Sequence, residues 1–220
     1  LKDRAWTKAD CYAPVLRQDS LRLLISIAVQ VGCVAKQGDC KNAFCQPRLP
    51  GDEVVIVMPP PGCPRSEPFT YWKLRKTLYG LGWSPRHWYE NFKKHLLSIG
   101  FKACTHDPCI FLGYRPGYPN DPIYIGCYVD YFIYFSTDRR VEEWFEASLA
   151  SRISVDFMGP VCWLLGIYFH WSVNPEGMWV HLSQAGFVHA LLLKDEQDRS
   201  NVVKTPYRSG LCIDRIPKPS

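Results

Sequence analysis

The pattern of apolar and polar residues predicts four helices along this chain. The clearest covers residues 84–100, where apolar residues recur at helical spacing and a charged face alternates with them. Ser84 is its expected N-cap, Pro85 occupies the first turn, and Gly100 ends it. The other predicted helices cover residues 20–32, residues 138–151 and a segment that begins at Ser183.

Short apolar runs between these helices predict strands. They cover residues 53–58, 109–113, 123–129, 161–170 and 177–182. The run YVDYFIYF, residues 128–135, is expected to turn at Asp130 and Tyr131 and to return as a hairpin. Because strands and helices are mixed without regular alternation, the expected class is α+β, with an antiparallel sheet packed on helices.

Composition narrows this picture to a folded domain. Apolar residues make up 47% of the chain and aromatic residues 14%, which excludes a disordered class. No apolar run approaches the roughly 20 residues that a membrane-spanning helix needs. The chain starts with Leu and not Met, so an upstream segment is expected in the full protein.

The ten cysteines indicate a reducing, intracellular compartment, with nucleus, cytoplasm and organelle left open. They are scattered without a CxxC pair, unlike the framework of a disulfide-rich secreted domain. One cluster, Cys104, His106 and Cys109, has three potential zinc ligands but no fourth nearby. Packed thiols are the favoured interpretation there, and a zinc site is the alternative.

The net charge of +5 is concentrated in one stretch. Residues 73–102 contain a single acid, Glu90, and several tryptophans and tyrosines. We call the basic residues of this stretch the basic strip: Lys73, Arg75, Lys76, Arg86, Lys93, Lys94 and Lys102. Basic residues interleaved with aromatic ones suit a nucleic-acid backbone, and a solvated helix face is the equally weighted alternative.

Two carboxylates stand in apolar surroundings, Asp39 in KQGDC and Asp130 in YVDYFIYF. Burial of an unpaired carboxylate is unfavourable unless a metal ion or a hydrogen-bond network offsets it. Carboxylate oxygens are the protein ligands that Mg²⁺ prefers. Taken alone, such a pair is more often structural than catalytic.

The order of short motifs along the chain favours the catalytic interpretation of these two carboxylates. The chain contains APV, a Leu-rich helix, QGDCKNAF, PPPG, LYGLGWSPRHWY, DPCIF, YVDY, LLGI, LSQ and TP in this order. The series resembles the reverse transcriptase domain of Ty1/copia-type retrotransposons over about residues 10–206. Each motif is weakly specific, but their shared order is not expected by chance.

The resemblance implies a right-hand polymerase palm with partial fingers over residues 1–206, followed by an extended tail over residues 207–220. In that family three carboxylates hold two Mg²⁺ ions for phosphoryl transfer to a primer. Asp39 and Asp130 match two of them as catalytic and metal-binding residues, and Tyr131 stands where the third acid is expected.

The resemblance also assigns residues around the carboxylates. Phe44 matches the aromatic residue that excludes ribonucleotides, and Ser84 and Pro85 match the element beneath the incoming nucleotide. The basic strip would face nucleic acid, with Lys73, Arg75, Lys76, Arg86, Lys93 and Lys94 as contacts.

Several departures from the family pattern concern catalysis. Tyr131 replaces an acid, LGWSPR lacks a Lys and a Gln of the family motif, and QGDC places Gly38 beside the metal strand. The favoured hypothesis is a catalytically impaired domain that acts as a structural or nucleic-acid-binding subunit of a larger assembly with protein or nucleic-acid partners. The alternative is an active RNA-dependent DNA polymerase that uses Mg²⁺ at Asp39 and Asp130.

A further expectation concerns aromatic residues at segment ends. Exposed tryptophans are typical anchors of interfaces between macromolecules. The candidates are Trp6, Trp72, Trp83, Trp171 and Trp179.

Overall fold

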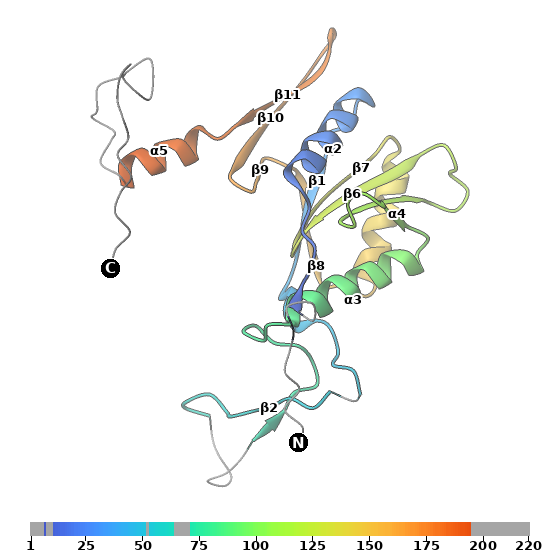
Figure 1. Cartoon of the computed structure of the whole chain (residues 1–220). Coiled ribbons are helices and arrows are strands. Elements are labelled where there is room, and N and C mark those ends of the chain that lie inside the picture. Colours follow the sequence, from blue (N-terminus) through green and yellow to red (C-terminus); the bar gives the residue numbers. More distant parts are fainter. Residues whose placement is uncertain (1–6, 8–10, 52, 64–70, 195–220) are drawn as a thin grey trace.

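A computed structural model describes residues 7, 11–51, 53–63 and 71–194 (Figure 1). The predicted tail over residues 207–220 lies outside these ranges. In chain order the elements are α2 (Gln18–Gln30), β1 (Lys36–Cys40), the 3-10 helix η1 (Ala43–Cys45), β2 (Ile56–Val57), β3 (Trp72–Lys73), α3 (Ser84–Ser98), β4 (Lys102–Ala103), β5 (Ile110–Tyr114), β6 (Pro122–Tyr128), β7 (Tyr131–Ser136), α4 (Arg139–Ala150), β8 (Val155–Pro160), β9 (Trp163–Leu164), β10 (Ile167–Asn174), β11 (Gly177–Ser183) and α5 (Ala185–Lys194).

The main sheet has six strands in the order β4-β5-β6-β7-β1-β8. The early strand β1 lies between two late ones and pairs antiparallel with both β7 and β8. Strands β9, β10 and β11 form a second sheet, and β2 and β3 form a small third one. Every pairing between these strands is antiparallel, so the predicted α+β class is confirmed.

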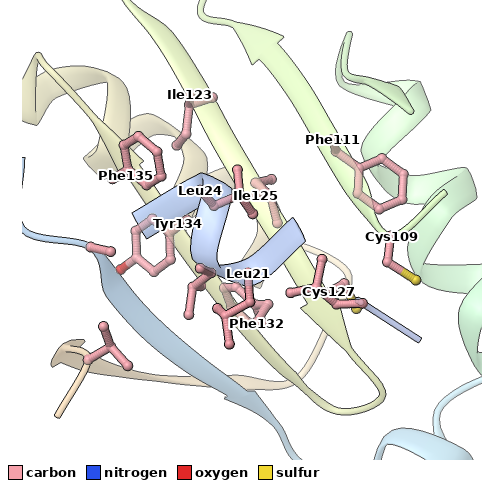
Figure 2. Close-up of a cluster of buried hydrophobic side chains, with 14 of the residues drawn as sticks. Leu21, Leu24, Cys109, Phe111, Ile123, Ile125, Cys127, Phe132, Tyr134 and Phe135 are labelled. Carbon is pink, nitrogen blue, oxygen red and sulfur yellow. The ribbon is translucent and has the colours of Figure 1, made fainter. Parts of the chain in front are cut away.

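Helices cover both faces of the six-stranded sheet, with α2 on one side and α3 and α4 on the other (Figure 1). On the α2 side, a Cβ atom added to Gly126 of β6 would lie 2.6 Å from Leu24 Cδ1. On the other side, the ring of Phe132 lies 6.1 Å from that of Phe92 in α3 and 6.2 Å from that of Phe145 in α4. Figure 2 shows part of the resulting core.

The structure corrects three of the local predictions. The hairpin between β6 and β7 turns at Val129 and Asp130, one residue earlier than predicted, so Tyr131 begins β7 and is not part of the turn. Helix α3 has Trp83 and not Ser84 at its N-cap position, because the Ser84 hydroxyl donates instead to the carbonyl oxygen of Leu78 at 2.7 Å. Strand β8 was not predicted, since its residues alternate between half-buried and exposed positions and include no long apolar run.

Gly38 has a packing role that the sequence comparison did not suggest. A Cβ atom at this position would lie 2.3 Å from the Cζ atom of Phe132, a ring that is almost fully buried. The glycine therefore lets the aromatic ring lie directly against the backbone of β1. The QGDC sequence is explained by this contact and is not by itself a sign of relaxed constraint.

The CTHDPC loop is organised by Asp107. This buried carboxylate accepts the backbone N–H of Cys109 at 2.9 Å and the backbone N–H of Arg17, just before α2, at 3.2 Å. Cys109 lies in the core, and burial raises the pKa of its thiol to about 12. Within the described ranges no cluster of three or more His, Cys, Asp or Glu residues is arranged to hold a metal ion.

The described helices are also too short or too polar to cross a membrane.

The contact between Gly38 and Phe132 predicts that Gly38→Ala destabilises the fold. Overpacking a filled core commonly costs about 1–3 kcal/mol of unfolding free energy, and a 2.3 Å approach to a buried ring places this change at the upper end. Urea denaturation measures the change. The control is Gly51→Ala, where an added Cβ meets nothing within 4 Å. Equal stability of the two variants would contradict the packing argument.

Candidate functional site

The turn between β6 and β7 is strained and firmly held. Val129 adopts a φ of 58°, a left-handed conformation that is unfavourable for a β-branched residue. The indole Nε1–H of Trp88 in α3 donates to the Val129 carbonyl oxygen at 2.6 Å. The backbone N–H of Cys40 in β1 donates to the carbonyl oxygen of Asp130 at 2.8 Å. These bonds from two neighbouring elements fix the position of Asp130.

Asp39 lies at the same end of the sheet as this turn. Its pairing partners are Tyr131 on β7 and Asp156 on β8, so it has a neighbour on each side. Residues directly opposite each other on antiparallel strands have Cβ atoms about 4.5–5.5 Å apart. Desolvation, followed by the charges of Asp130 and Asp156, raises the pKa of Asp39, and the charge of Lys41 opposes this shift. Asp39, Asp130, Asp156 and Lys41 therefore share one electrostatic environment.

Asp39 faces away from α3. Gly38 faces the ring of Phe132, which packs toward that helix, and successive residues of a strand point to opposite faces. Asp39 therefore points to the opposite face of the sheet from Gly38. Asp39 and Asp130 are both partly exposed, and they are not the fully buried carboxylates that the apolar flanking sequence suggested.

The donors at this site do not fit a centre for two magnesium ions. Tyr131, which is 38% exposed, offers a phenol oxygen in place of a carboxylate and is a poor ligand for Mg²⁺. Asp156 is the remaining nearby acid, but its carboxylate is bound by the Nζ atom of Lys41 at 2.6 Å. Among the residues that the structure describes, Asp39 and Asp130 are left as carboxylate donors at this site.

Tyr79 is a member of this site that the sequence did not single out. Its ring lies 5.0 Å from that of Phe44, at an interplanar angle of 48°. Desolvation and then the charges of Asp130, Cys45 and Asp39 raise the pKa of its hydroxyl, so the phenol lies near both carboxylates. Tyr79 belongs to the family motif LYGLGWSPRHWY, but nothing in the sequence indicates that its side chain lies near the carboxylate of Asp39 at the end of β1.

The predicted nucleotide-binding residues have different environments. Phe44 and Pro85 line an apolar cavity of about 360 Å³ together with Trp88 and Val129. The Phe44 carbonyl oxygen accepts a hydrogen bond from the Thr77 hydroxyl, which fixes the backbone at that residue. The Ser84 side chain is fully buried, and its hydroxyl bonds to the loop before α3 as described above.

Comparison with known proteins gives the family of this chain. Residues 3–209 match the family model described as reverse transcriptase (RNA-dependent DNA polymerase). The chain belongs to the reverse transcriptase family. It is 31% identical over 198 residues to the retrovirus-related Pol polyprotein from transposon RE1 of Arabidopsis thaliana, and 25% identical over 207 residues to that from transposon TNT 1-94 of Nicotiana tabacum.

These relatives are much longer than the present reverse transcriptase-like chain. The matches cover 90% and 94% of this chain but only 13% and 15% of the two polyproteins. They support the resemblance to Ty1/copia-type retrotransposons that the motif order suggested. No solved structure matches the chain significantly.

The basic strip of the reverse transcriptase-like chain is distributed over β3, α3, β4 and the segments next to them. Lys73 lies in β3 and Arg75 follows it, and both are exposed. Lys93 on α3 lies over the ring of Tyr89, with its Nζ atom 5.6 Å from the ring centre. Arg86 is exposed at the start of α3.

The remaining two contacts, Lys76 and Lys94, line one groove together with Arg48 and Arg152. The sequence did not suggest these two arginines, because they are distant from the basic strip along the chain.

The tryptophans that were predicted to lie on the surface differ in their exposure. Trp72 and Trp179 are exposed, whereas Trp171 is half-buried and donates its indole N–H to the Val161 carbonyl oxygen at 2.8 Å. The prediction for Trp83 is wrong, because its side chain is buried and its ring packs 4.9 Å from that of His87. Trp6 lies outside the described residues.

The bond from Trp88 to the turn leads to a test of how the turn is held. Trp88→Phe removes the indole donor, so the Val129 carbonyl loses a partner at a cost of about 1–3 kcal/mol in unfolding free energy. The change is expected to accelerate amide hydrogen exchange at Asp130 and Tyr131. The matched control, Trp171→Phe, removes the corresponding bond to Val161. Similar exchange at the turn in both variants would show that Trp88 does not hold it.

The raised pKa of Asp39 predicts a pH-dependent effect of Asp39→Asn. The folded state binds the proton of this carboxyl more tightly than the unfolded chain, whose pKa is near the ordinary value of 3.8. Ionisation therefore opposes folding above that pH, and the opposition is lost as the pH falls through the folded-state pKa. Asp39→Asn should raise the melting temperature at neutral pH, with the gain vanishing below about pH 3.8.

Asp138→Asn is a control for which the change in melting temperature is expected to have the opposite sign. A hydrogen bond from Arg140 lowers the pKa of Asp138 to about 2. Removing this charge should lower the melting temperature at neutral pH, with the loss fading as the wild-type carboxyl becomes protonated. A stability change at Asp39 that does not depend on pH would contradict the electrostatic account.

Proposed function

We propose that this reverse transcriptase-like domain is catalytically impaired and serves as a nucleic-acid-binding or structural subunit of a larger complex. The single observation that supports this most is the position of Tyr131. It pairs directly with Asp39 across β1 and β7, where the family pattern places an acid. A site that concentrates two divalent cations loses much of its rate when one negative charge is missing.

The nearby acid Asp156 does not compensate for Tyr131. Its short ion pair with Lys41 offsets the charge that it would bring to Asp39. Both partners of this pair are about half exposed, so the pair contributes little to stability, but a cation must leave before Asp156 can bind another. In this proposal the site keeps the geometry of the sheet without the charge that the reaction needs.

The binding half of the proposal rests on exposed side chains outside the carboxylate site. Trp72 and Lys73 are adjacent and exposed on the small sheet formed by β2 and β3. An exposed aromatic ring beside a cation suits a stacked base and its phosphate. We assign the six-stranded sheet to the palm of a right-hand polymerase and the small sheet to part of its fingers, on the basis of the family resemblance.

The larger complex is inferred from chain length and exposed apolar surface. The matched region is a small part of the Pol polyproteins that resemble it. Helix α5 has no buried residue, and Phe187 and Leu193 are among its exposed apolar side chains. Apolar surface of this kind is typical of a region that contacts other macromolecules.

The second candidate is an active RNA-dependent DNA polymerase with Mg²⁺ at Asp39 and Asp130. The observation in its favour is that desolvation and then the charge of Asp130 raise the pKa of Asp39, since mutual repulsion is expected of carboxylates poised for a cation. When bound, the ion would supply charge neutralisation for phosphoryl transfer. Asp39 and Asp130 would hold it, and waters and substrate phosphates would complete its shell.

Primer extension separates the two candidates. The unaltered chain is expected to extend a primed RNA template no faster than background in the presence of Mg²⁺ and deoxynucleotides. Tyr131→Asp supplies the missing acid, and Tyr131→Phe is the matched control that keeps the ring and adds no charge. We expect Tyr131→Asp to restore little, because Lys and Gln of the family's LKQAPR motif are also replaced in LGWSPR.

Binding of the same template should be measured in parallel by fluorescence anisotropy. Binding without extension is the expected result. Robust extension by the unaltered chain, abolished by Asp39→Asn, would refute the impaired-domain proposal and support the polymerase.

A further inference from the structure

A basic groove lies beside α3, on the side of the sheet that Asp39 faces away from. We call it the α3 groove, and it has a volume of about 620 Å³. The residues that matter for its chemistry are Arg48, Lys76, Lys94, Arg152, Gln46 and Asn91. None of the described residues that line it is acidic.

Four separate segments supply its cations. Arg48 follows η1, Lys76 follows β3, Lys94 lies on α3, and Arg152 follows α4. All four side chains are exposed. Arg48 and Lys76 are brought together by an isolated antiparallel backbone bridge between their segments. In the ranges that the structure describes, no carboxylate forms an ion pair with any of the four.

One wall of the α3 groove is fixed by Gln46. Its side-chain amide donates to the carbonyl oxygens of Lys41 at 2.7 Å and Ser154 at 2.9 Å. Its carbonyl oxygen accepts the backbone N–H of Ser154 at 2.9 Å. These bonds tie the segment after η1 to the segment between α4 and β8. The cations on those segments are therefore held near one another by the fold, and their mutual repulsion favours an anionic ligand.

The groove continues along α3 into a second hollow of about 450 Å³. This hollow shares Arg48, Asn91 and Lys94 with the first and adds Lys93, together with one acid, Glu90. The joined surface carries more positive charge than a single phosphate group neutralises. A nucleic-acid strand instead presents about one negative charge every 3.4 Å along a duplex axis.

We propose that the α3 groove binds the sugar-phosphate backbone of a nucleic-acid strand, at a site separate from the Asp39 and Asp130 carboxylates. The groove lining contains no aromatic side chain among the described residues, so it offers no ring on which a base can stack. Contacts to phosphates alone position a strand without reading its sequence. This inference rests on the proposed function for the choice of nucleic acid and adds where the strand lies.

The test is salt-dependent binding of a short single-stranded RNA of mixed sequence to the full chain. Arg48→Gln combined with Lys94→Gln removes two cations from the groove. We expect binding roughly tenfold weaker near physiological salt, and a slope of log K against log salt that falls in magnitude by about 1.4, or ~0.7 for each lost phosphate contact. The loss should be the same for RNAs of different sequence.

The matched control combines Arg22→Gln with Arg139→Gln. It removes two cations, as the groove variant does, but Arg22 lies on α2 and Arg139 begins α4, at the opposite end of that helix from Arg152. Its affinity and salt slope are expected to change little. Thermal melting of both double variants verifies that each remains folded, and all four substituted side chains are exposed.

The outcomes separate this inference from the proposed function. If the unaltered chain binds RNA but both double variants weaken it equally, diffuse charge explains the binding and the groove is refuted while nucleic-acid binding stands. If the unaltered chain binds neither RNA nor DNA, the nucleic-acid part of the proposed function fails as well. Tighter, Arg48-dependent binding of polyglutamate than of RNA would assign the groove to an acidic protein segment and overturn the inference.

Discussion

The packing of one ring, that of Phe132, against a glycine in β1 is the contact on which the rest of the fold depends. The ring occupies the space where a side chain at Gly38 would lie. It also lies within about 6 Å of aromatic rings on α3, α4 and β8, those of Phe92, Phe145 and Phe157. One side chain thus links β1, its neighbour β8 and both helices on that face. Because Phe132 follows Tyr131 directly, its position also sets where the β6–β7 turn meets β1.

The geometry of the candidate site is therefore maintained by the core and not by the site residues themselves. Asp130 is positioned by bonds to backbone atoms of the turn, and Asp39 by strand pairing on both sides. Neither arrangement needs an acid at position 131. A tyrosine there is therefore compatible with the packing of the sheet, although it brings no carboxylate to the position opposite Asp39.

Elements with a strong local pattern were predictable from the sequence. The helix over residues 84–100 was predicted within two residues of the observed α3, because its apolar spacing and Pro85 act locally. Asp39 and Asp130 were found through motif order, and the structure puts them at the same end of the sheet. Their partners were not predictable. Asp156 reaches Asp39 only through a register that includes an irregularity between Gln37 and Gly38.

Contacts between residues that are distant in the sequence were not predictable, because they depend on the tertiary fold and not on a local pattern. The α3 groove combines cations from segments separated by as many as 104 residues, from Arg48 to Arg152, and no local pattern records this proximity. The burial of Trp83 was missed because a position at the end of a segment suggests exposure, whereas the preceding loop folds over the start of α3. Sequence periodicity specifies the face of an element, but tertiary packing decides what covers that face.

The left-handed backbone at Val129 has a consequence for how such domains diverge. Gly and Asn adopt this conformation with much less strain, so either residue would suit the turn better than valine does. The valine also lines the apolar cavity beside Phe44 and Pro85, so a replacement by Gly or Asn would give up this contact. Among related sequences, Gly or Asn at position 129 would mark hairpins in which a relaxed backbone has replaced the lining of the cavity.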